Sequence, residues 1–424
     1  MFAAWPQNKS FRQAPSTFLS VRDKITSPHD REYQFPVRYA FDYLHGGIKY
    51  LQRPQLELNN HVRSRTFLKL PEAGQDERQK TAYRSDHAID LFPLAAGLPW
   101  PCGILTCRQS KHWKLSLEAM DTLLKEFAAS DGQGVVSKSG KSIPELAQKE
   151  LASNSKEGWA KFPAYLFSEA DEERTKLLGA VNVFIFLFDD FWEMHELSTF
   201  FRVQEVFVDR MRPESHRNAG HKSSLESMIE KIITRILELD EQSGNDAGRD
   251  MIELMVRFFT RPAPPEKYDS MEDFLLYRIE DAAVPYVLGC TKFSLNSSVD
   301  LESSRLARYL RLVKDHVSIA NDLGSWDKEK AAYDSGHVLY MINVVDVVKH
   351  LFSCSTFEAA VAISQGLQYE IECQIDEELK RLIREDALTA EEWRFVDATL
   401  SVMSGNVLVS TIMSRYGGEG WRLQ

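Results

Sequence analysis

Residues 177–188 (LLGAVNVFIFLF) form an apolar run that a helix can accommodate only by burying it on nearly every side. Such a helix has no solvated face and belongs inside a bundle. Acidic residues at 171–173 suit its N-terminus, and Asp189-Asp190 ends the apolar run. The run is shorter than the roughly 20 apolar residues that cross a bilayer. A core helix over 171–197, with carboxylates at one end, is therefore predicted.

Helical periodicity continues through most of the chain after Pro101. Apolar residues recur three and four positions apart, and alternating strand patterns are essentially absent. We therefore predict an all-α bundle of about ten helices around an apolar interior. The predicted helices cover 116–129, 171–197, 224–240, 270–291, 301–330, 338–352, 356–383 and 389–415.

Nine prolines lie within residues 1–101. Proline interrupts regular structure, so residues 1–100 are predicted to be an extension of loops and short helices packed on a main domain, 101–424.

Composition excludes several classes of protein. The chain has 62 acidic and 51 basic residues and a net charge of -11, which disfavours a nucleic-acid partner. Its five cysteines lack zinc-site spacing, so we expect reduced thiols in a cytoplasmic protein. No apolar signal core opens the chain, and we expect no integral membrane span.

The carboxylates after the apolar run form a first acidic motif, DDFWE. On a helix, Asp189 and Glu193 share a face, and Asp190 lies about 100° away. Clustered carboxylates at the edge of an apolar interior suit a hard cation such as Mg²⁺. The alternative is a solvated helix end that happens to be acidic.

A second motif, NDLGSWDKE, lies about 130 residues downstream. Asn321, Ser325 and Glu329 are spaced one helical turn apart, within roughly 80° of one face. An amide oxygen, a hydroxyl and a carboxylate can together bind one Mg²⁺. A chance match is expected on the order of 0.004 times at average residue usage. The alternative, a plain polar helix face, is correspondingly weak.

The two motifs, in this order and at this separation, resemble those of class I terpene synthases over roughly residues 150–416. The resemblance implies a class I terpenoid synthase bundle with three Mg²⁺ ions at its mouth. Asp189 would bind two of them, and Asn321, Ser325 and Glu329 would hold the third.

Members of that family also hold the substrate's diphosphate with basic and phenolic side chains. Arg278, Lys328 and the pair Arg415-Tyr416 resemble these contacts. The chain departs from the pattern in having Val409 where many relatives have tryptophan. In the segment that relatives use as a helix break, it has Asp281-Ala282, and Pro285 and Gly289 could supply the break.

The pocket is expected on the helical faces that carry the motifs. Residues three, four and seven positions before Asp189, and three and four before Asn321, share those faces. The expected pocket residues are Asn182, Ile185, Phe186, Val317 and Ser318.

The resemblance implies Mg²⁺-dependent ionisation of a linear isoprenyl diphosphate, and farnesyl diphosphate is the expected substrate. Cyclisation would yield a sesquiterpene hydrocarbon or alcohol and diphosphate. Two alternatives stay open: a prenyl-chain-elongating synthase, and a helical protein that binds diphosphate without catalysis. A monomer or a homodimer is expected.

Overall fold

The computed structural model describes residues 86–91, 93, 98, 100–130, 142–152, 159, 161–192, 208, 211–212, 224–336, 338, 340–413 and 416. Within these ranges it contains twelve α-helices and one sheet of two short strands. The predicted all-α class is therefore confirmed.

The helices after the first hundred residues form the body of the protein. Their bounds are α5 (Trp113–Ala128), α6 (Ile143–Ala152), α7 (Lys161–Leu166), α8 (Glu172–Trp192), α11 (Ser224–Ser243), α12 (Ala247–Phe259), α13 (Met271–Asp281), α14 (Val284–Ser294), α15 (Ala307–Asp334), α16 (Val344–Leu351), α17 (Phe357–Arg384) and α18 (Ala390–Ile412).

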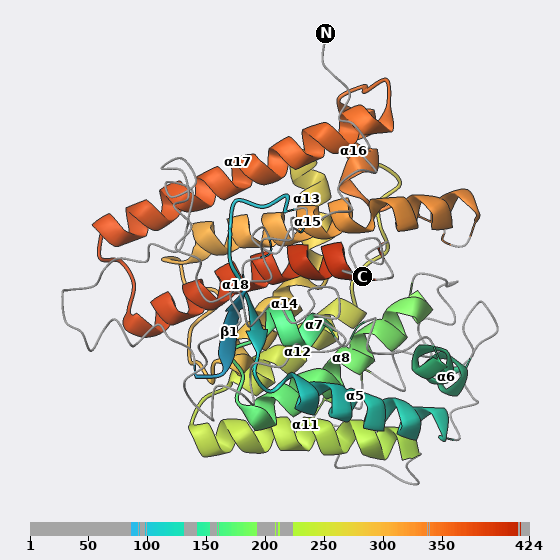
Figure 1. The fold of residues 1–424 in the computed structure, drawn as a ribbon, viewed down its shortest axis with the longest axis vertical. Coiled ribbons are helices and arrows are strands. Elements are labelled where there is room, and N and C mark those ends of the chain that lie inside the picture. Colours follow the sequence, from blue (N-terminus) through green and yellow to red (C-terminus); the bar gives the residue numbers. More distant parts are fainter. Residues whose placement is uncertain are drawn as a thin grey trace, which may run out of the picture.

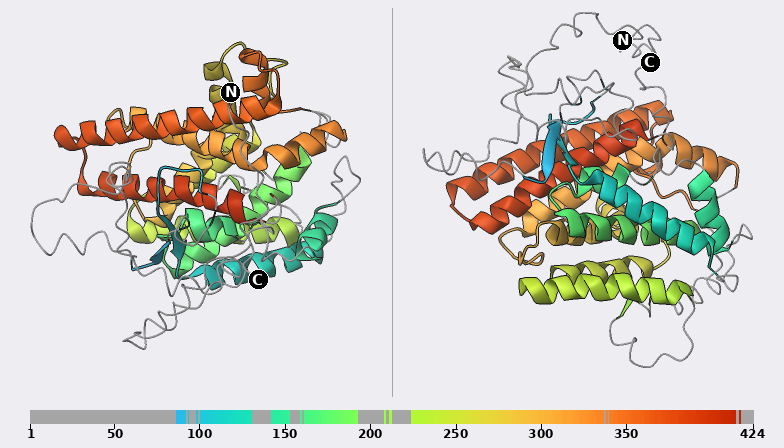
Figure 2. Two further views of the ribbon diagram at one scale, coloured as in Figure 1. Left: turned by 45° about the horizontal axis from the view of Figure 1, so that its top comes forward. Right: turned by 60° about the horizontal axis from the view of Figure 1, so that its bottom comes forward.

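Helix α18 runs through the middle of the bundle (Figure 1) and contacts α7, α14 and α15. Helices α17 and α11 lie on opposite sides of the body in Figure 1 and in the right view of Figure 2. Helix α15 packs between α17 and α18 and also contacts α13, α14 and α16. The helix that carries the second motif is therefore surrounded by other helices.

Helix α18 corrects one expectation from the sequence. It is long and apolar enough to cross a membrane by length and composition, although we expected no stretch to approach that length. Most of its apolar window is buried inside the bundle, and its polar residues Ser404 and Asn406 are buried as well. These are the properties of a core helix in a folded body.

Helices α15 and α18 approach closely at one glycine. A Cβ atom at Gly324 would lie 2.4 Å from the Cβ of Ser410, well inside van der Waals contact. The absence of a side chain at Gly324, in the middle of the second motif, thus sets how closely the motif helix lies against the central helix.

A short hairpin was not expected. Strand β1 (Ala88–Leu91) pairs antiparallel with β2 (Cys107–Ser110), with Leu91 opposite Cys107. Arg108 of β2 donates hydrogen bonds to Glu169 at 3.0 Å and to Asp397 of α18 at 2.5 Å. This ion-pair group ties the hairpin, which spans the predicted boundary at residue 100, to the helical body.

The helix predicted over 270–291 is divided in two. Ala283 has a left-handed backbone (φ 54°) between α13 and α14, and Pro285 lies in the first turn of α14. Pro285 therefore contributes to the break as expected, whereas Gly289 lies inside α14 and packs on Met251 and Leu254 of α12. Other boundaries moved slightly: α15 runs to Asp334, past the predicted end at 330.

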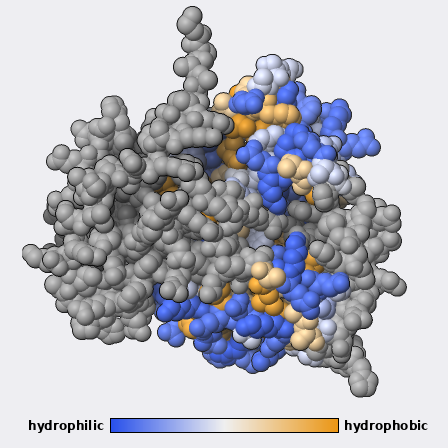
Figure 3. Space-filling model, turned by 45° about the vertical axis from the view of Figure 1, so that its right-hand side comes forward, coloured by the Kyte–Doolittle hydropathy of each residue, from blue (hydrophilic) through white to orange (hydrophobic). Residues whose placement is uncertain are grey.

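Figure 3 shows one face of the molecule. The described residues on this face are mainly hydrophilic, and the apolar ones form small separate groups. Apolar side chains are instead concentrated in the interior, where one large core cluster includes residues of α5, α8, α12, α14, α15 and α18.

Candidate functional site

The three polar residues of the second motif lie on one continuous helix. Helix α15 spans Asn321, Ser325 and Glu329 without a break, so the predicted spacing of one turn between them is confirmed. Ser325 is buried, while Asn321 and Glu329 are half-buried. Their side chains therefore follow one another at intervals of one turn along one face of α15.

Arg278 of α13 joins this helix through its guanidinium group. Its Nε donates to Asp322 Oδ1 at 2.7 Å and one terminal nitrogen donates to Asn321 Oδ1 at 3.2 Å, while the other terminal nitrogen donates to Asp281. Arg278 is buried. A guanidinium has five N–H donors, and these bonds use three. The terminal nitrogen that donates to Asn321 also lies 2.7 Å from Asp322 Oδ1, so Asp281, Asn321 and Asp322 together hold the guanidinium in place.

The charges around Arg278 are buried and mutually compensating. Asp281 also accepts a hydrogen bond from Arg261 at 3.0 Å. Burial alone would lower the pKa of Arg278, but Asp322 and Asp281 hold the pKa well above its ordinary value. Arg278 is therefore a permanent cation in a position where an unpaired charge would be very costly.

Asp322 is the residue at the centre of the site that sequence reasoning missed. Its side chain is fully buried, and its Oδ2 accepts the main-chain N–H of Val344 at 2.7 Å. Burial raises the pKa of Asp322 to about 7, while Arg278 and the Val344 N–H act in the opposite direction. The carboxylate thus connects α13, α15 and the start of α16. Its neighbours in the motif are identifiable by spacing, but its partners lie 22 and 44 residues away.

Two of the other expected diphosphate contacts lie close together. The Lys328 Nζ lies 5.9 Å from the centre of the Tyr416 ring, within the range of a cation–π contact. Lys328 is half-buried and follows the Ser325 turn on α15. Arg415 lies outside the described residues.

The first motif is described only in part. Asp189 and Asp190 lie in the last turn of α8, and this turn has no basic residue. The helix dipole places partial negative charge at that end, so two carboxylates there are unfavourable without a cation. The side chains of Asp189 and Asp190, and the whole of Glu193, lie outside the described residues.

The expected pocket residues are in the interior. Asn182 and Phe186 of α8 and Val317 and Ser318 of α15 are buried, and Ile185 is half-buried. The Phe186 ring stacks on Trp159 with centroids 5.6 Å apart, and Asn182 Nδ2 donates to the Trp159 carbonyl at 3.1 Å. The two α8 residues therefore share one partner.

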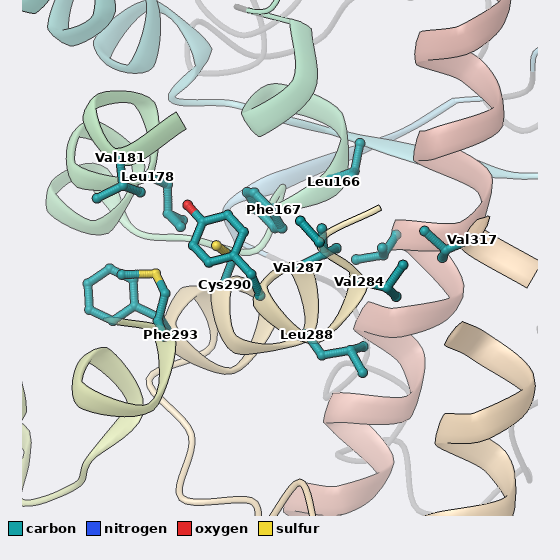
Figure 4. Packing of buried hydrophobic residues seen from close by; sticks show 14 of the residues in the cluster. Leu166, Phe167, Leu178, Val181, Val284, Val287, Leu288, Cys290, Phe293 and Val317 are labelled. Carbon is teal, nitrogen blue, oxygen red and sulfur yellow. The ribbon is translucent and has the colours of Figure 1, made fainter. Parts of the chain in front are cut away.

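Helix α14 contributes none of the five expected pocket residues, yet it lies in this region. It contacts both α8 and α15, and Figure 4 shows Val284 and Val287 of α14 beside Phe167, with Val181 of α8 and Val317 of α15 on either side. The five expected residues therefore leave out an apolar helix that lies between the α8 and α15 residues. The only local signal was the proline that opens α14.

The donor set of the second motif fits a hard divalent cation. Carboxamide, hydroxyl and carboxylate oxygens are the ligands that Mg²⁺ prefers. The Ser325 hydroxyl donates its hydrogen to the Asn321 carbonyl at 2.9 Å, so its lone pairs face away from that bond. Asn321 Oδ1 accepts one N–H from Arg278 and has a second lone pair.

Comparisons with known proteins agree with this arrangement. Residues 180–371 match the family described as terpene synthase family 2, C-terminal metal binding. The chain is 24% identical over 345 residues to terpene cyclase 6 of Gibberella fujikuroi, covering 78% of this chain and 86% of that protein. It is also 24% identical over 263 residues to a bifunctional sesterterpene synthase of Aspergillus aculeatus. That alignment covers 58% of this chain and 35% of that protein.

A solved structure shows the same fold. The crystal structure of aristolochene synthase from Penicillium roqueforti aligns with a TM-score of 0.55 at 14% identity, over 69% of this chain and 93% of that one.

Proposed function

We propose that this chain, a lyase-type terpene cyclase by its similarity to the class I terpene synthases, converts farnesyl diphosphate to a cyclic sesquiterpene and releases diphosphate. We infer the fifteen-carbon length of the substrate from the resemblance of the two motifs and from the size of the protein. The relative that makes a sesterterpene is the reason to test longer substrates.

One observation carries the proposal. Helix α15 presents Asn321, Ser325 and Glu329 on one side, and Arg278 donates to the first of them. Oxygen ligands and a bidentate cation at one place are what a diphosphate with its metal requires. We assign Asn321, Ser325 and Glu329 as ligands of one Mg²⁺ and Asp189, Asp190 and Glu193 as the ligands of two more.

Mg²⁺ would supply positive charge for the two phosphate groups as they take on charge in leaving. The carboxylates at the end of α8 are unfavourable for the helix dipole, so cation binding there would also remove a cost that the protein bears without it.

The protein's own residues stabilise the leaving group and shape the cation. Arg278, Lys328, Arg415 and Tyr416 would donate hydrogen bonds to the phosphate oxygens. The allylic C–O bond then breaks, and its electron pair leaves with the diphosphate. Hydrogen-bond donors already aimed at that oxygen stabilise the charge as it develops.

The carbocation that remains has to be folded away from water. Asn182, Ile185, Phe186, Val317 and Ser318 are the pocket residues that we propose, and α14 adds Val284 and Val287 to the apolar wall. The Phe186 ring offers its face to positive charge. The cyclised cation ends by losing a proton or by capturing one water.

The experiment is a product analysis with substrates of ten, fifteen, twenty and twenty-five carbons. With Mg²⁺, we expect diphosphate release and a cyclic fifteen-carbon product by gas chromatography, and no release after chelation. Condensation with isopentenyl diphosphate would instead show a chain-elongating synthase. Binding of substrate without release would show a non-catalytic protein.

A pair of serine variants links the result to α15. Ser325→Ala removes the buried hydroxyl of the motif, whereas Ser335→Ala changes an exposed serine at the end of the same helix. We expect only Ser325→Ala to raise the Mg²⁺ concentration needed for turnover. Equal Mg²⁺ dependence in both variants would contradict the assignment of Ser325.

A further inference from the structure

Asn343, immediately before α16, is bonded to the second motif from outside it. The residue is fully buried. Its Nδ2 donates to Glu329 Oε2 at 2.9 Å and to the Asp322 main-chain carbonyl at 2.9 Å, while its Oδ1 accepts the N–H of Val345 at 2.9 Å. One amide therefore connects the last metal-motif residue, the centre of α15 and the first turn of α16.

These bonds fix the orientation of the amide. Both hydrogens of Nδ2 meet acceptors, and Oδ1 meets the N–H that an N-cap residue normally satisfies. Turning the amide over would place Oδ1 against a carboxylate and a carbonyl and Nδ2 against an N–H. Because the site is buried, each such mismatch would leave a polar group unpaired at considerable cost. The N-cap bond of α16 therefore fixes the orientation in which Asn343 Nδ2 donates to Glu329.

The bond to Glu329 limits where that carboxylate can point. Glu329 lies half-buried near the end of the 28-residue helix α15, and its side chain has three rotatable bonds before the carboxylate. Holding Oε2 at 2.9 Å removes much of that freedom. A ligand that is already oriented binds a metal without the entropy cost of ordering its side chain.

The other side of the same junction is also held. Asp322 Oδ2 accepts the Val344 N–H, next to Asn343, and Asp322 Oδ1 accepts from Arg278. The N-terminus of α16 is therefore connected on one side to the proposed metal ligand Glu329 and on the other to the proposed diphosphate contact Arg278.

We propose that Asn343 is a positioning residue, which orients Glu329 for metal binding and connects the start of α16 to the site. The proposal rests on the function proposed above. Hydrogen-bond partners of metal ligands tune affinity by about 10- to 100-fold in general.

Asn343→Ser separates the two roles of the side chain. Serine caps a helix about as well as asparagine, but its one hydroxyl cannot replace the donor that reaches Glu329. The measurement is calorimetric binding of inorganic diphosphate at increasing Mg²⁺, which does not depend on turnover. We expect the Mg²⁺ concentration for half-maximal binding to rise about 10-fold. Asn343→Thr is a second capping variant, with the same expectation, if the serine variant is too unstable to purify.

Thr356→Ala is the matched control. The Thr356 hydroxyl caps α17 by accepting the Ala359 N–H at 3.2 Å, at an exposed position. Its loss should lower the melting temperature and leave the Mg²⁺ dependence of diphosphate binding unchanged. If Asn343→Ser shifts that dependence no more than Thr356→Ala does, Asn343 is only a cap and the proposal is wrong.

A double-mutant cycle with Glu329→Gln tests the route of the effect. If Asn343 acts through Glu329, adding Asn343→Ser to Glu329→Gln should weaken binding by less than 2-fold further. Fully multiplicative effects would overturn the proposal. Binding that is weakened by Glu329→Gln but unchanged by Asn343→Ser overturns the role of Asn343 alone. Wild-type protein that shows no Mg²⁺-dependent diphosphate binding overturns the metal site itself, and Asn343 with it.

Discussion

Helix α15 carries two buried polar clusters, and they differ in how completely they are closed. The Arg278 cluster (Arg278, Asp281, Asn321, Asp322) lies toward α13 and includes the half-buried Asn321. The His316 cluster (Cys102, His316, Gln368, Glu372) lies toward α17, and all four residues are buried. One helix thus has an accessible polar side and a sealed one.

In the His316 cluster, the Glu372 carboxylate is occupied by donors from three parts of the chain. It accepts from His316 Nε2 at 3.0 Å, Gln368 Nε2 at 3.0 Å and the Gly103 N–H at 2.8 Å. The ligand atoms of Cys102, His316 and Glu372 all lie within 4.8 Å of one another. The hydrogen bonds satisfy the Glu372 carboxylate and His316 Nε2, whereas the buried His316 Nδ1 has no hydrogen-bond partner among the described residues. The cluster fastens the segment around residue 102 to α15 and α17.

A buried charged group on this helix can therefore serve either stability or binding. What separates the two is whether polar atoms remain that a ligand could reach. Each of the following predictions changes one cluster, or a contact beside it, and asks whether stability or chemistry responds.

The largest expected effect is on stability, from Glu372→Gln. An amide in place of the carboxylate puts an N–H₂ group among three donors, and disrupting a buried charged network of this kind costs about 3–5 kcal/mol. Denaturant unfolding at neutral pH should show this loss. The Mg²⁺ dependence of turnover in the folded fraction should be unchanged, since Glu372 lies on the sealed side.

The same variant gives a pH test. Burial acts to raise the pKa of Glu372, but the bonds from His316, Gln368 and Gly103 leave it below its ordinary value of 4.5. A lowered folded-state pKa stabilises the protein above pH 4.5, and this contribution is lost as pH falls through the lowered value. The difference in free energy of unfolding between the wild type and Glu372→Gln should therefore become smaller as the pH falls below 4.5. Glu370→Gln, at an exposed position of α17, should change stability by less than about 0.5 kcal/mol.

Arg278→Lys should show the reverse pattern, with chemistry responding more than stability. Lysine keeps the charge but cannot bind in two-point fashion, and removing one aligned donor from a developing anion costs about 100-fold in turnover. Steady-state kinetics would measure it. Arg257→Lys is the control, because Arg257 makes a surface pair with Glu280. Equal turnover in the two variants would mean that the Arg278 cluster is structural, like the His316 cluster.

The helices that carry the two clusters could be predicted from the sequence, but the contacts between residues of different helices could not. Spacing placed Asn321, Ser325 and Glu329 on one helix, because helical geometry is local. The partners of Asp322 are Arg278 and Val344, and those of Glu372 include Gly103, 269 residues away. Such contacts depend on how helices pack, which no short pattern encodes.

Two local features were also beyond prediction, for different reasons. Ala283 adopts a left-handed backbone, a conformation that usually selects glycine or asparagine, so its residue type gives no signal. The strands of the β1–β2 hairpin have four residues each, too few for an alternating pattern to stand out. The boundary predicted at residue 100, Arg415 and the side chains of the first motif remain predictions.

Gly324→Ala tests the third contact of α15, its close approach to α18. The new methyl group would meet the Cβ of Ser410 at 2.4 Å and its Oγ at 2.8 Å, and overpacking of this kind costs about 1–3 kcal/mol. Gly366→Ala on α17 is the control, since nothing lies within 4 Å of a Cβ there and alanine favours a helix by about 0.5–1 kcal/mol. Thermal unfolding should therefore move in opposite directions for the two variants.

A second substitution identifies the cause. Ser410→Gly removes the atom that Gly324→Ala would strike, so the double variant should lose less stability than the sum of the single variants. Additive losses would mean that the close approach at Gly324 is not what limits packing between the two helices.

The smallest expected effect on turnover concerns Phe186, whose buried ring stacks on Trp159. Phe186→Leu keeps an apolar side chain but removes an aromatic face, which is worth about 0.5–2 kcal/mol to a nearby cation. Such a difference is enough to redistribute a carbocation among competing products. Gas chromatography should therefore show a broader product mixture at a turnover close to that of the wild type, since the diphosphate contacts are unchanged.

Phe184→Leu is the control, because it removes an aromatic ring from the opposite face of the same helix. Phe184 lies two residues earlier on α8, about 200° around the helix, and stacks on Phe127 of α5 with centroids 6.1 Å apart. It is fully buried, so its replacement should lower stability and leave the product ratios as they are. Phe186 stacks instead on Trp159. If both variants give wild-type products, Phe186 belongs to the sealed interior like Phe184. If only Phe184→Leu alters the products, the pocket lies on the α5 side of α8, opposite to the face proposed from Asp189.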